Sequence, residues 1–273
     1  MTLEEAPADG GQRNSVVVTG AANGIGKSIV ARLAATGWAV VGVDRDDAAL
    51  KEVVSRAGGV AVPGDVRDHE VLTGARQAAE GVGKLSAWVN NAGVVRLGPL
   101  HQMAPDVIDE TLDIDLRAVI FGTREALTSF LGNGVPGSIV NISSVHARGS
   151  FPGFGAYDAA KGGIESLTRY VCVEYGHLGI RCNAIAPGAV NTSIVPAVKP
   201  DDPGTASSAI EARDLSPMRR VSEPQEIAEV VAFLVEGPST AINGHVLAVD
   251  NGMSAWNCAF PPDDSVAFAG PSR

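Results

Sequence analysis

The sequence predicts a single α/β domain in which a doubly wound, parallel sheet of seven strands carries helices on both faces. Short runs of β-branched residues alternate with longer segments of helical periodicity, which is the pattern of βαβ units. The length of 273 residues suits one α/β domain with two short ends, and no internal repeat of about 20–50 residues divides it. A second domain is therefore not expected.

Each expected element follows from a local pattern. Seven short β-branched runs predict strands at Ser15–Thr19, Ala39–Val43, Val60–Val62, Leu85–Val89, Ser138–Ile142, Cys182–Ala186 and Val246–Val249. The segments between them have helical periodicity and predict helices at Gly24–Thr36, Asp46–Ala57, Asp68–Gly81, Pro105–Leu131, Gly155–His177 and Glu223–Val235. The last helix opens with Ser222-Glu223-Pro224-Gln225, which matches a capping box.

Residues 15–253 carry this pattern, whereas the two ends do not. Residues 1–14 and the final stretch from 259 are aperiodic and rich in Pro, Gly and Asp, so we expect flexible ends, with residues 254–273 as a C-terminal tail. The N-terminus has no apolar signal segment, and no run approaches about 18 apolar residues. We therefore expect no membrane association.

Charge and cysteine content exclude several classes of function. Lys and Arg number 21 against 31 Asp and Glu, and a net charge of −10 argues against nucleic-acid binding. The three cysteines have no CxxC spacing, and the histidines have no metal-ligand spacing, so we predict neither disulfides nor a metal site. A reducing, cytoplasmic location fits this composition.

The first strand runs into the glycine-rich turn Thr19–Gly26, and a helix follows it. The pattern is G-x-x-x-G-x-G, formed by Gly20, Gly24 and Gly26. Glycines at a strand-to-helix turn let backbone amides approach a pyrophosphate, and the positive end of the helix points at the phosphates. This turn predicts a dinucleotide site.

The second expected strand is followed by Asp44, 24 residues after Gly20. An acid near this offset accepts hydrogen bonds from the hydroxyls of the adenosine ribose. It also repels a 2′-phosphate, by about 4 kcal/mol at about 4 Å and an effective dielectric of about 20. We therefore predict NAD over NADP, although the neighbouring Arg45 is of the type that cradles such a phosphate.

A tyrosine and a lysine are spaced one helical turn apart at Tyr157 and Lys161. A nearby ammonium group favours the phenolate, which makes a tyrosine useful as a general acid or base. Ser144 lies 13 residues upstream, after a buried strand, where its hydroxyl can return beside the tyrosine and hold a substrate oxygen.

These motifs together resemble the short-chain dehydrogenase/reductase family, in its single-domain, Rossmann-like branch of about 250 residues. The resemblance covers residues 15–253. It rests on Thr19–Gly26, Asp65-Val66, N-N-A-G at Asn90–Gly93, Ser144, Tyr157-x-x-x-Lys161 and P-G-x-V-x-T at Pro187–Thr192. It implies an oxidoreductase acting on a secondary alcohol or ketone, and members are usually dimers or tetramers, so a homo-oligomer is expected.

The resemblance also assigns residues. Implied catalytic residues are Ser144, Tyr157, Lys161 and Asp115, and the resemblance implies substrate contacts at Ser144 and Tyr157. His146 is a further expected substrate contact, because it lies two residues after Ser144 on a loop at a strand end. Implied cofactor-binding residues are Gly20, Asn23, Gly24, Ile25, Gly26, Asp44, Arg45, Asp65, Val66, Asn91, Ala92, Gly93, Tyr157, Lys161, Pro187, Gly188, Val190 and Thr192. Residues 193–221 correspond to the family's substrate lid.

One position departs from the family pattern. Asp115 stands where the family usually has asparagine, so the amide donors are lost and a negative charge is added near Lys161. We expect catalysis to be retained. Two alternatives stay open: an NADP-linked carbonyl or 3-ketoacyl reductase, and a nucleotide-binding regulatory protein without turnover.

Overall fold

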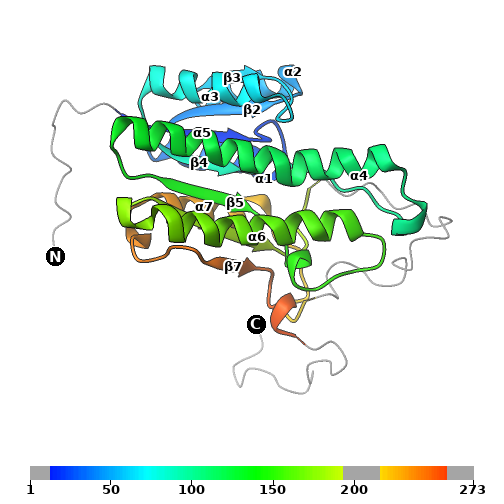
Figure 1. Cartoon of the computed structure of the whole chain (residues 1–273). Coiled ribbons are helices and arrows are strands. Elements are labelled where there is room, and N and C mark those ends of the chain that lie inside the picture. The colour runs from blue at the N-terminus through cyan, green and yellow to red at the C-terminus, as the bar shows by residue number, and fades with distance from the viewer. Residues whose placement is uncertain (1–12, 193–215, 257–273) are drawn as a thin grey trace, which may run out of the picture.

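The computed structural model describes residues 13–192 and 216–256, and within them seven parallel strands form one sheet. The strand order is β3-β2-β1-β4-β5-β6-β7, so the chain winds outward in both directions from β1 and β4 (Figure 1). The strands are β1 (Asn14–Thr19), β2 (Ala39–Asp44), β3 (Val60–Pro63), β4 (Lys84–Asn90), β5 (Ser138–Ile142), β6 (Arg181–Pro187) and β7 (Val246–Val249). The predicted doubly wound fold is confirmed.

Helices cover both faces of this sheet. In Figure 1, α3, α5 and α6 lie on the near face, and α1 and α7 lie behind the sheet. The helices are α1 (Gly24–Ala35), α2 (Asp47–Arg56), α3 (His69–Val82), α4 (Pro105–Leu112), α5 (Ala118–Asn133), α6 (Gly155–Tyr175) and α7 (Pro224–Val235). None of the helices in the described ranges is long and apolar enough to cross a membrane.

Alternate side chains of each strand build two hydrophobic cores. Val16 and Val18 of β1 join the core under α1 and α7, whereas Val17 points to the opposite core with Val41 and Phe130. Both faces are buried, which explains why the strands are nearly continuous apolar runs rather than alternating ones.

The expected helix Pro105–Leu131 was wrong in one respect. The helical segment is interrupted between α4 and α5 by a π-helical turn at Asp113–Arg117, and α5 continues to Asn133. A π turn adds a residue to the helical repeat without changing the apolar composition, so periodicity alone does not reveal it. The turn buries Ile114 and Asp115.

The start of the last helix also differs from the expectation. The N-cap is Glu223 rather than Ser222, and the carboxylate of Glu226 accepts a hydrogen bond from the Glu223 N–H at 2.9 Å. The capping box therefore begins at Glu223, one residue later than expected, because Pro224 occupies the first helical position. Residues 193–215 of the expected lid, Cys258 and most of both expected chain ends lie outside the described residues. Asn14, which was expected in a flexible N-terminal segment, is instead the first residue of β1.

Candidate active site

The glycine-rich turn connects β1 to α1 at the carboxyl edge of the sheet. Gly20 has a φ of +65°, and a β-carbon on it would lie 2.8 Å from the Ala92 Cα. A β-carbon on Gly26 would collide with the Gly20 carbonyl oxygen. Helix α1 has no acidic residue in its first turn, and the Asn23 side chain does not cap it. The open N–H groups at its start therefore fit a pyrophosphate.

Thr19 and Asn91 hold this turn against the end of β4. The Thr19 hydroxyl accepts hydrogen bonds from the backbone N–H groups of Asn91 (3.0 Å) and Ala92 (3.1 Å). The Asn91 amide donates in return to the carbonyls of Thr19 (2.9 Å) and Gly20 (3.0 Å). Thr19, which was not among the expected cofactor-binding residues, stabilises the glycine turn through these hydrogen bonds.

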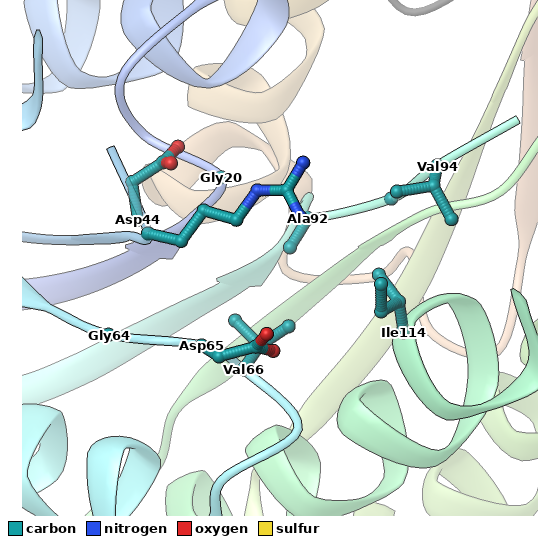
Figure 2. A pocket seen from close by; sticks show the side chains of 10 residues that line it. Gly20, Asp44, Gly64, Asp65, Val66, Ala92, Val94 and Ile114 are labelled. Carbon is teal, nitrogen blue, oxygen red and sulfur yellow. The ribbon is translucent and has the colours of Figure 1, made fainter. Parts of the chain in front are cut away.

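A pocket opens beside this turn (Figure 2). Seven expected cofactor residues line it together with three that were not expected: Gly20, Asp44, Arg45, Asp65, Val66, Ala92 and Gly93, with Gly64, Val94 and Ile114. The lining comes from the ends of β1, β2, β3 and β4 and from the π turn. The pocket therefore joins residues that are up to 94 positions apart in the chain.

Two carboxylates of this pocket have fixed orientations. Asp44, the last residue of β2, accepts hydrogen bonds from the backbone N–H groups of Ala22 and Asp46, each at 3.0 Å. Asp65 pairs with the Arg67 guanidinium at 2.6 Å. That side-chain hydrogen bond is the largest of the effects that lower the pKa of Asp65. The carboxylate of Asp65 is therefore already neutralised by a partner, whereas the partners of Asp44 among the described residues are backbone N–H groups.

Tyr157, Lys161 and Ser144 come together where β5 ends and α6 begins. The Lys161 ammonium lies over the Tyr157 ring, 5.3 Å from its centroid, and donates to the Ile142 carbonyl at 3.2 Å. All three side chains are buried. Ser144 caps the short turn after β5, where its hydroxyl accepts the His146 N–H at 3.2 Å.

Asp115 reaches this group from the π turn. Its Oδ1 accepts the Val94 N–H at 2.7 Å, while Oδ2 is buried without a hydrogen-bond partner. A β-carbon on Gly93 would lie 3.1 Å from Asp115 Oδ1 and 3.5 Å from Lys161 Nζ, so the two charged groups approach each other across this glycine. Burial raises the pKa of the Asp115 carboxyl, although the charge of Lys161 opposes the shift.

The segment after β6 returns to the glycine turn. Pro187 ends β6, and a β-carbon on Gly188 would lie 3.0 Å from Asp250. Val190 pairs with Ser222 in an isolated parallel bridge. The methyl group of Thr192 lies 3.2 Å from the position of a β-carbon on Gly24, so this segment packs against the first βα turn.

The chain is similar to known proteins over most of its length. A family model described as Enoyl-(Acyl carrier protein) reductase matches residues 20–254. The chain is 38% identical over 249 residues to 3beta-hydroxysteroid dehydrogenase 1 of Eggerthella lenta, covering 89% of this chain and 94% of the relative.

Two solved structures are similar across the fold. The 3-ketoacyl-(acyl-carrier-protein) reductase from Brucella melitensis complexed with NADH has a TM-score of 0.81 and 30% identity. An actinorhodin polyketide ketoreductase with NADPH has a TM-score of 0.80 and 27% identity. Each comparison covers 89% of this chain and 98% of the other.

This chain belongs to the short-chain dehydrogenase/reductase family. It is an oxidoreductase of that family with a Rossmann-like fold and a nicotinamide cofactor. The glycine turn fits such a cofactor on this structure's own evidence, because side chains at Gly20 or Gly26 would fill the space that backbone and ligand need. Within the described residues, no group of three or more His, Cys, Asp or Glu is arranged to hold a metal ion.

Several features of this short-chain dehydrogenase/reductase could not be predicted from motifs. His146 was expected to contact substrate, but its pairing with Asp158 at 2.9 Å was not expected. Phe151 and Phe154 also pack on the His146 ring, with centroids 4.9 Å and 4.3 Å away. An aromatic-rich loop just before Tyr157 is the signal that could have pointed to them.

Proposed function

We propose that this protein is an NAD-dependent dehydrogenase that converts a secondary alcohol to a ketone, or catalyses the reverse reduction. The observation that supports the proposal is the contact between Tyr157 and Lys161 on α6, next to the end of β5, where Lys161 donates to the Ile142 carbonyl. His146 contacts both Ser144 and Tyr157 there. This group lies at the same sheet edge as the glycine turn.

In oxidation, Tyr157 takes the proton of the substrate hydroxyl as the general base, and Ser144 holds the substrate oxygen by a hydrogen bond. The Lys161 ammonium supplies a positive charge beside Tyr157, 5.3 Å from the centroid of its ring. The nicotinamide, when bound, supplies the hydride chemistry. The protein's contribution is to align the hydroxyl and to hold the proton at the Tyr157 oxygen.

We propose the other expected cofactor residues as its binding site. The amides around Gly20, Asn23, Gly24, Ile25 and Gly26 hold the pyrophosphate, and Asp65, Val66 and Asn91–Gly93 surround the adenosine. Lys161 and Tyr157 hold the nicotinamide ribose, and Pro187, Gly188, Val190 and Thr192 hold the carboxamide. The support is the pocket at the sheet edge and the packing of Thr192 against Gly24.

The proposal of NAD rests on Asp44. Its carboxylate is held at the pocket by two backbone N–H groups, and a 2′-phosphate would meet this negative charge directly. The 3beta-hydroxysteroid dehydrogenase relative supports a secondary alcohol as substrate, since its name specifies a hydroxyl group on a ring.

A second candidate is an NADP-linked carbonyl or 3-ketoacyl reductase. Arg45 favours it, because this arginine lines the same pocket and guanidinium groups bind phosphates. The similarity to a ketoreductase with NADPH points the same way. The choice depends on whether Asp44 or Arg45 meets the ribose.

The test measures turnover of a panel of secondary alcohols with NAD and with NADP. The absorbance of the reduced nicotinamide reports the rate of each reaction. We expect turnover with NAD at a kcat/KM at least about a hundredfold above that with NADP, since about 4 kcal/mol of repulsion corresponds to nearly a thousandfold. A preference for NADP would overturn the assignment to Asp44. Hydride transfer with any alcohol would eliminate a purely regulatory role.

We further propose that the protein works in the cytoplasm as a homo-oligomer, a dimer or a tetramer. Both described cysteines, Cys172 and Cys182, are free, as suits a reducing compartment. Helices α5 and α6 expose apolar side chains on the same side of the sheet, with Val173 82% exposed and Tyr170 54% exposed. A second copy of the chain would cover this surface.

A further inference from the structure

His146 packs against a cluster of aromatic side chains that includes Tyr157. Its ring meets the Tyr157 ring edge to face, with centroids 5.5 Å apart, and it packs against Phe151 and Phe154. The His146 backbone N–H also donates to the Ser144 hydroxyl at 3.2 Å. The residue therefore contacts both groups that handle the substrate oxygen in the proposed reaction.

Asp158 pairs with the imidazole of His146 at its Nδ1 atom. It follows Tyr157 in the first turn of α6, and its Oδ1 lies 2.9 Å from His146 Nδ1. The side chains of His146 and Asp158 are 15% and 13% exposed, respectively. A carboxylate only accepts hydrogen bonds, so the Nδ1 atom carries the proton. The nitrogen Nε2 is then a hydrogen-bond acceptor whenever the ring is neutral.

The surroundings favour the neutral ring. Burial lowers the pKa of His146, while the carboxylate of Asp158 opposes the shift. Within the described residues, the imidazole makes its hydrogen bond at Nδ1 and none at Nε2, and 15% of the His146 side chain is exposed. The Nε2 nitrogen can therefore accept a hydrogen bond from a molecule that enters beside Tyr157.

We propose that Asp158 is a positioning residue that presents His146 Nε2 as an acceptor for a second substrate hydroxyl, on a carbon next to the one that reacts. This inference rests on the proposed function, because Ser144 and Tyr157 are taken to hold the reacting oxygen. The aromatic rings of Phe151 and Phe154 supply an apolar surface for the carbon frame. The favoured substrate class is a vicinal diol, or the corresponding hydroxyketone, on an apolar frame.

The first experiment compares cis-1,2-cyclohexanediol with cyclohexanol in wild type, Asp158→Asn, Asp158→Ala and His146→Phe. We expect wild type to favour the diol about tenfold in kcat/KM, mainly through KM, the scale of one hydrogen bond. Asp158→Asn keeps an oxygen acceptor for Nδ1 and should keep the preference. Asp158→Ala and His146→Phe should lose it. A preference unchanged in His146→Phe, or lost equally in Asp158→Asn and Asp158→Ala, would overturn the proposal.

The second experiment needs no turnover. Nitrogen NMR of histidine-labelled protein, with the His146 signals assigned through His146→Phe, reports which ring nitrogen carries the proton. We expect protonated Nδ1 in wild type and in Asp158→Asn at neutral pH, and a shift toward the other tautomer in Asp158→Ala. Protonated Nε2 in wild type would refute the proposal. Failure of all alcohols in the activity panel, with the expected NMR result, would instead count against the proposed reaction.

Discussion

Tyr157 is set apart from Tyr170 by its surroundings rather than by its chemistry. Both are on α6, but Tyr157 is buried beneath the Lys161 ammonium, and Tyr170 is 54% exposed. A general base that acts on a substrate hydroxyl must be beside a group that stabilises its charged form. This difference gives the proposed mechanism a matched pair of tests on one helix.

Replacement of Tyr157 by Phe removes the hydroxyl and keeps the ring. We expect kcat to fall by about 10²–10⁴-fold, because the general acid/base is lost. The affinity for NAD should fall far less, because the proposed contacts of Lys161, the pyrophosphate and the adenosine remain. Steady-state kinetics and cofactor titration measure the two effects. Tyr170→Phe, the control, should keep wild-type turnover. Full activity in Tyr157→Phe would refute the assigned role.

Asp115 stands where the resemblance implies an asparagine, and the structure gives this aspartate a physical consequence. Its pKa is raised in the folded protein by burial. The unfolded chain therefore releases this proton more readily, and the ionised group destabilises the fold once the pH exceeds the ordinary Asp range. Below that range the penalty disappears.

We therefore expect Asp115→Asn to unfold at a higher temperature than wild type at pH 7, and the difference to vanish as the pH falls below about 4. Thermal unfolding monitored by circular dichroism at several pH values measures this. Asp113→Asn is the control, because Asp113 is in the same π turn but pairs on the surface with Arg117 at 3.5 Å. A stability difference that is constant with pH would contradict the explanation.

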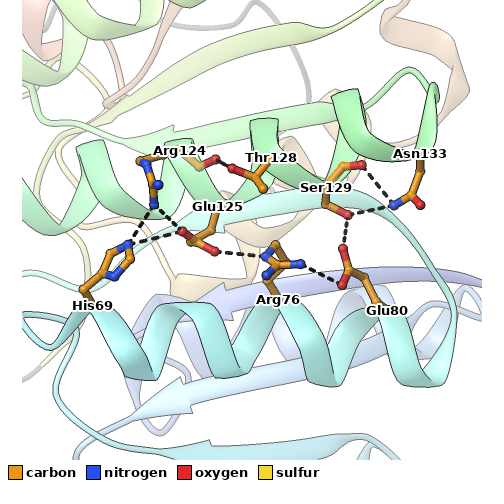
Figure 3. A network of polar contacts seen from close by, with 8 residues as sticks. All are labelled: His69, Arg76, Glu80, Arg124, Glu125, Thr128, Ser129 and Asn133. Atoms are coloured by element: carbon orange, nitrogen blue, oxygen red, sulfur yellow. Dashed lines mark hydrogen bonds and ion pairs between the residues drawn. The ribbon is translucent and has the colours of Figure 1, made fainter.

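At the scale of elements, a buried carboxylate joins helices α3 and α5. Glu125 of α5 is 2% exposed and pairs with Arg76 at 2.9 Å, His69 at 3.2 Å and Arg124 at 2.8 Å (Figure 3). Arg76 also pairs with Glu80, which accepts the Ser129 hydroxyl at 2.7 Å. The network fixes how α5 sits beside α3, and α5 continues from the turn that carries Asp115.

Truncation of Glu125 to Ala leaves the Arg76 guanidinium without its buried partner. We expect a loss of about 3 kcal/mol in the free energy of unfolding, the scale for breaking a buried ion pair. Chemical denaturation measures this. Glu52→Ala, the control, removes an exposed pair with Arg56 and should cost less than about 1 kcal/mol. Equal losses in the two variants would show that burial of Glu125 is unimportant.

At the scale of the whole molecule, the apolar surface of α5 and α6 predicts self-association. Ile120 and Leu131 of α5 are each 44% exposed, and Val173 of α6 is almost fully exposed. Such side chains are costly in water unless a partner covers them, about 1.5–3 kcal/mol for each one fully buried.

Replacement of Val173 by Lys should therefore weaken the oligomer and leave the fold intact. Light scattering coupled to size-exclusion chromatography should show a shift toward smaller species at micromolar concentration. Phe233→Lys is the control, since Phe233 is exposed on α7, behind the sheet. A wild-type protein that is monomeric at all concentrations would contradict the prediction of self-association.

The sequence by itself determined the sheet, the glycine turn and the pairing of Tyr157 with Lys161. These depend on local information: β-branched runs, turn glycines and residues one helical turn apart. The same local reasoning placed Asp44 at the end of its strand and predicted which strand ends meet at the site, because parallel strands share a carboxyl edge.

Only the tertiary structure decided what surrounds these residues. It placed Asp115 on a π turn with one buried oxygen unpartnered, paired His146 with Asp158 across 12 positions, and joined Glu125 to Arg76 across 49. Burial and charge pairing arise between elements that are far apart in the chain. No periodicity in the sequence records which side chains will meet there, and these contacts set the burial and orientation of the groups.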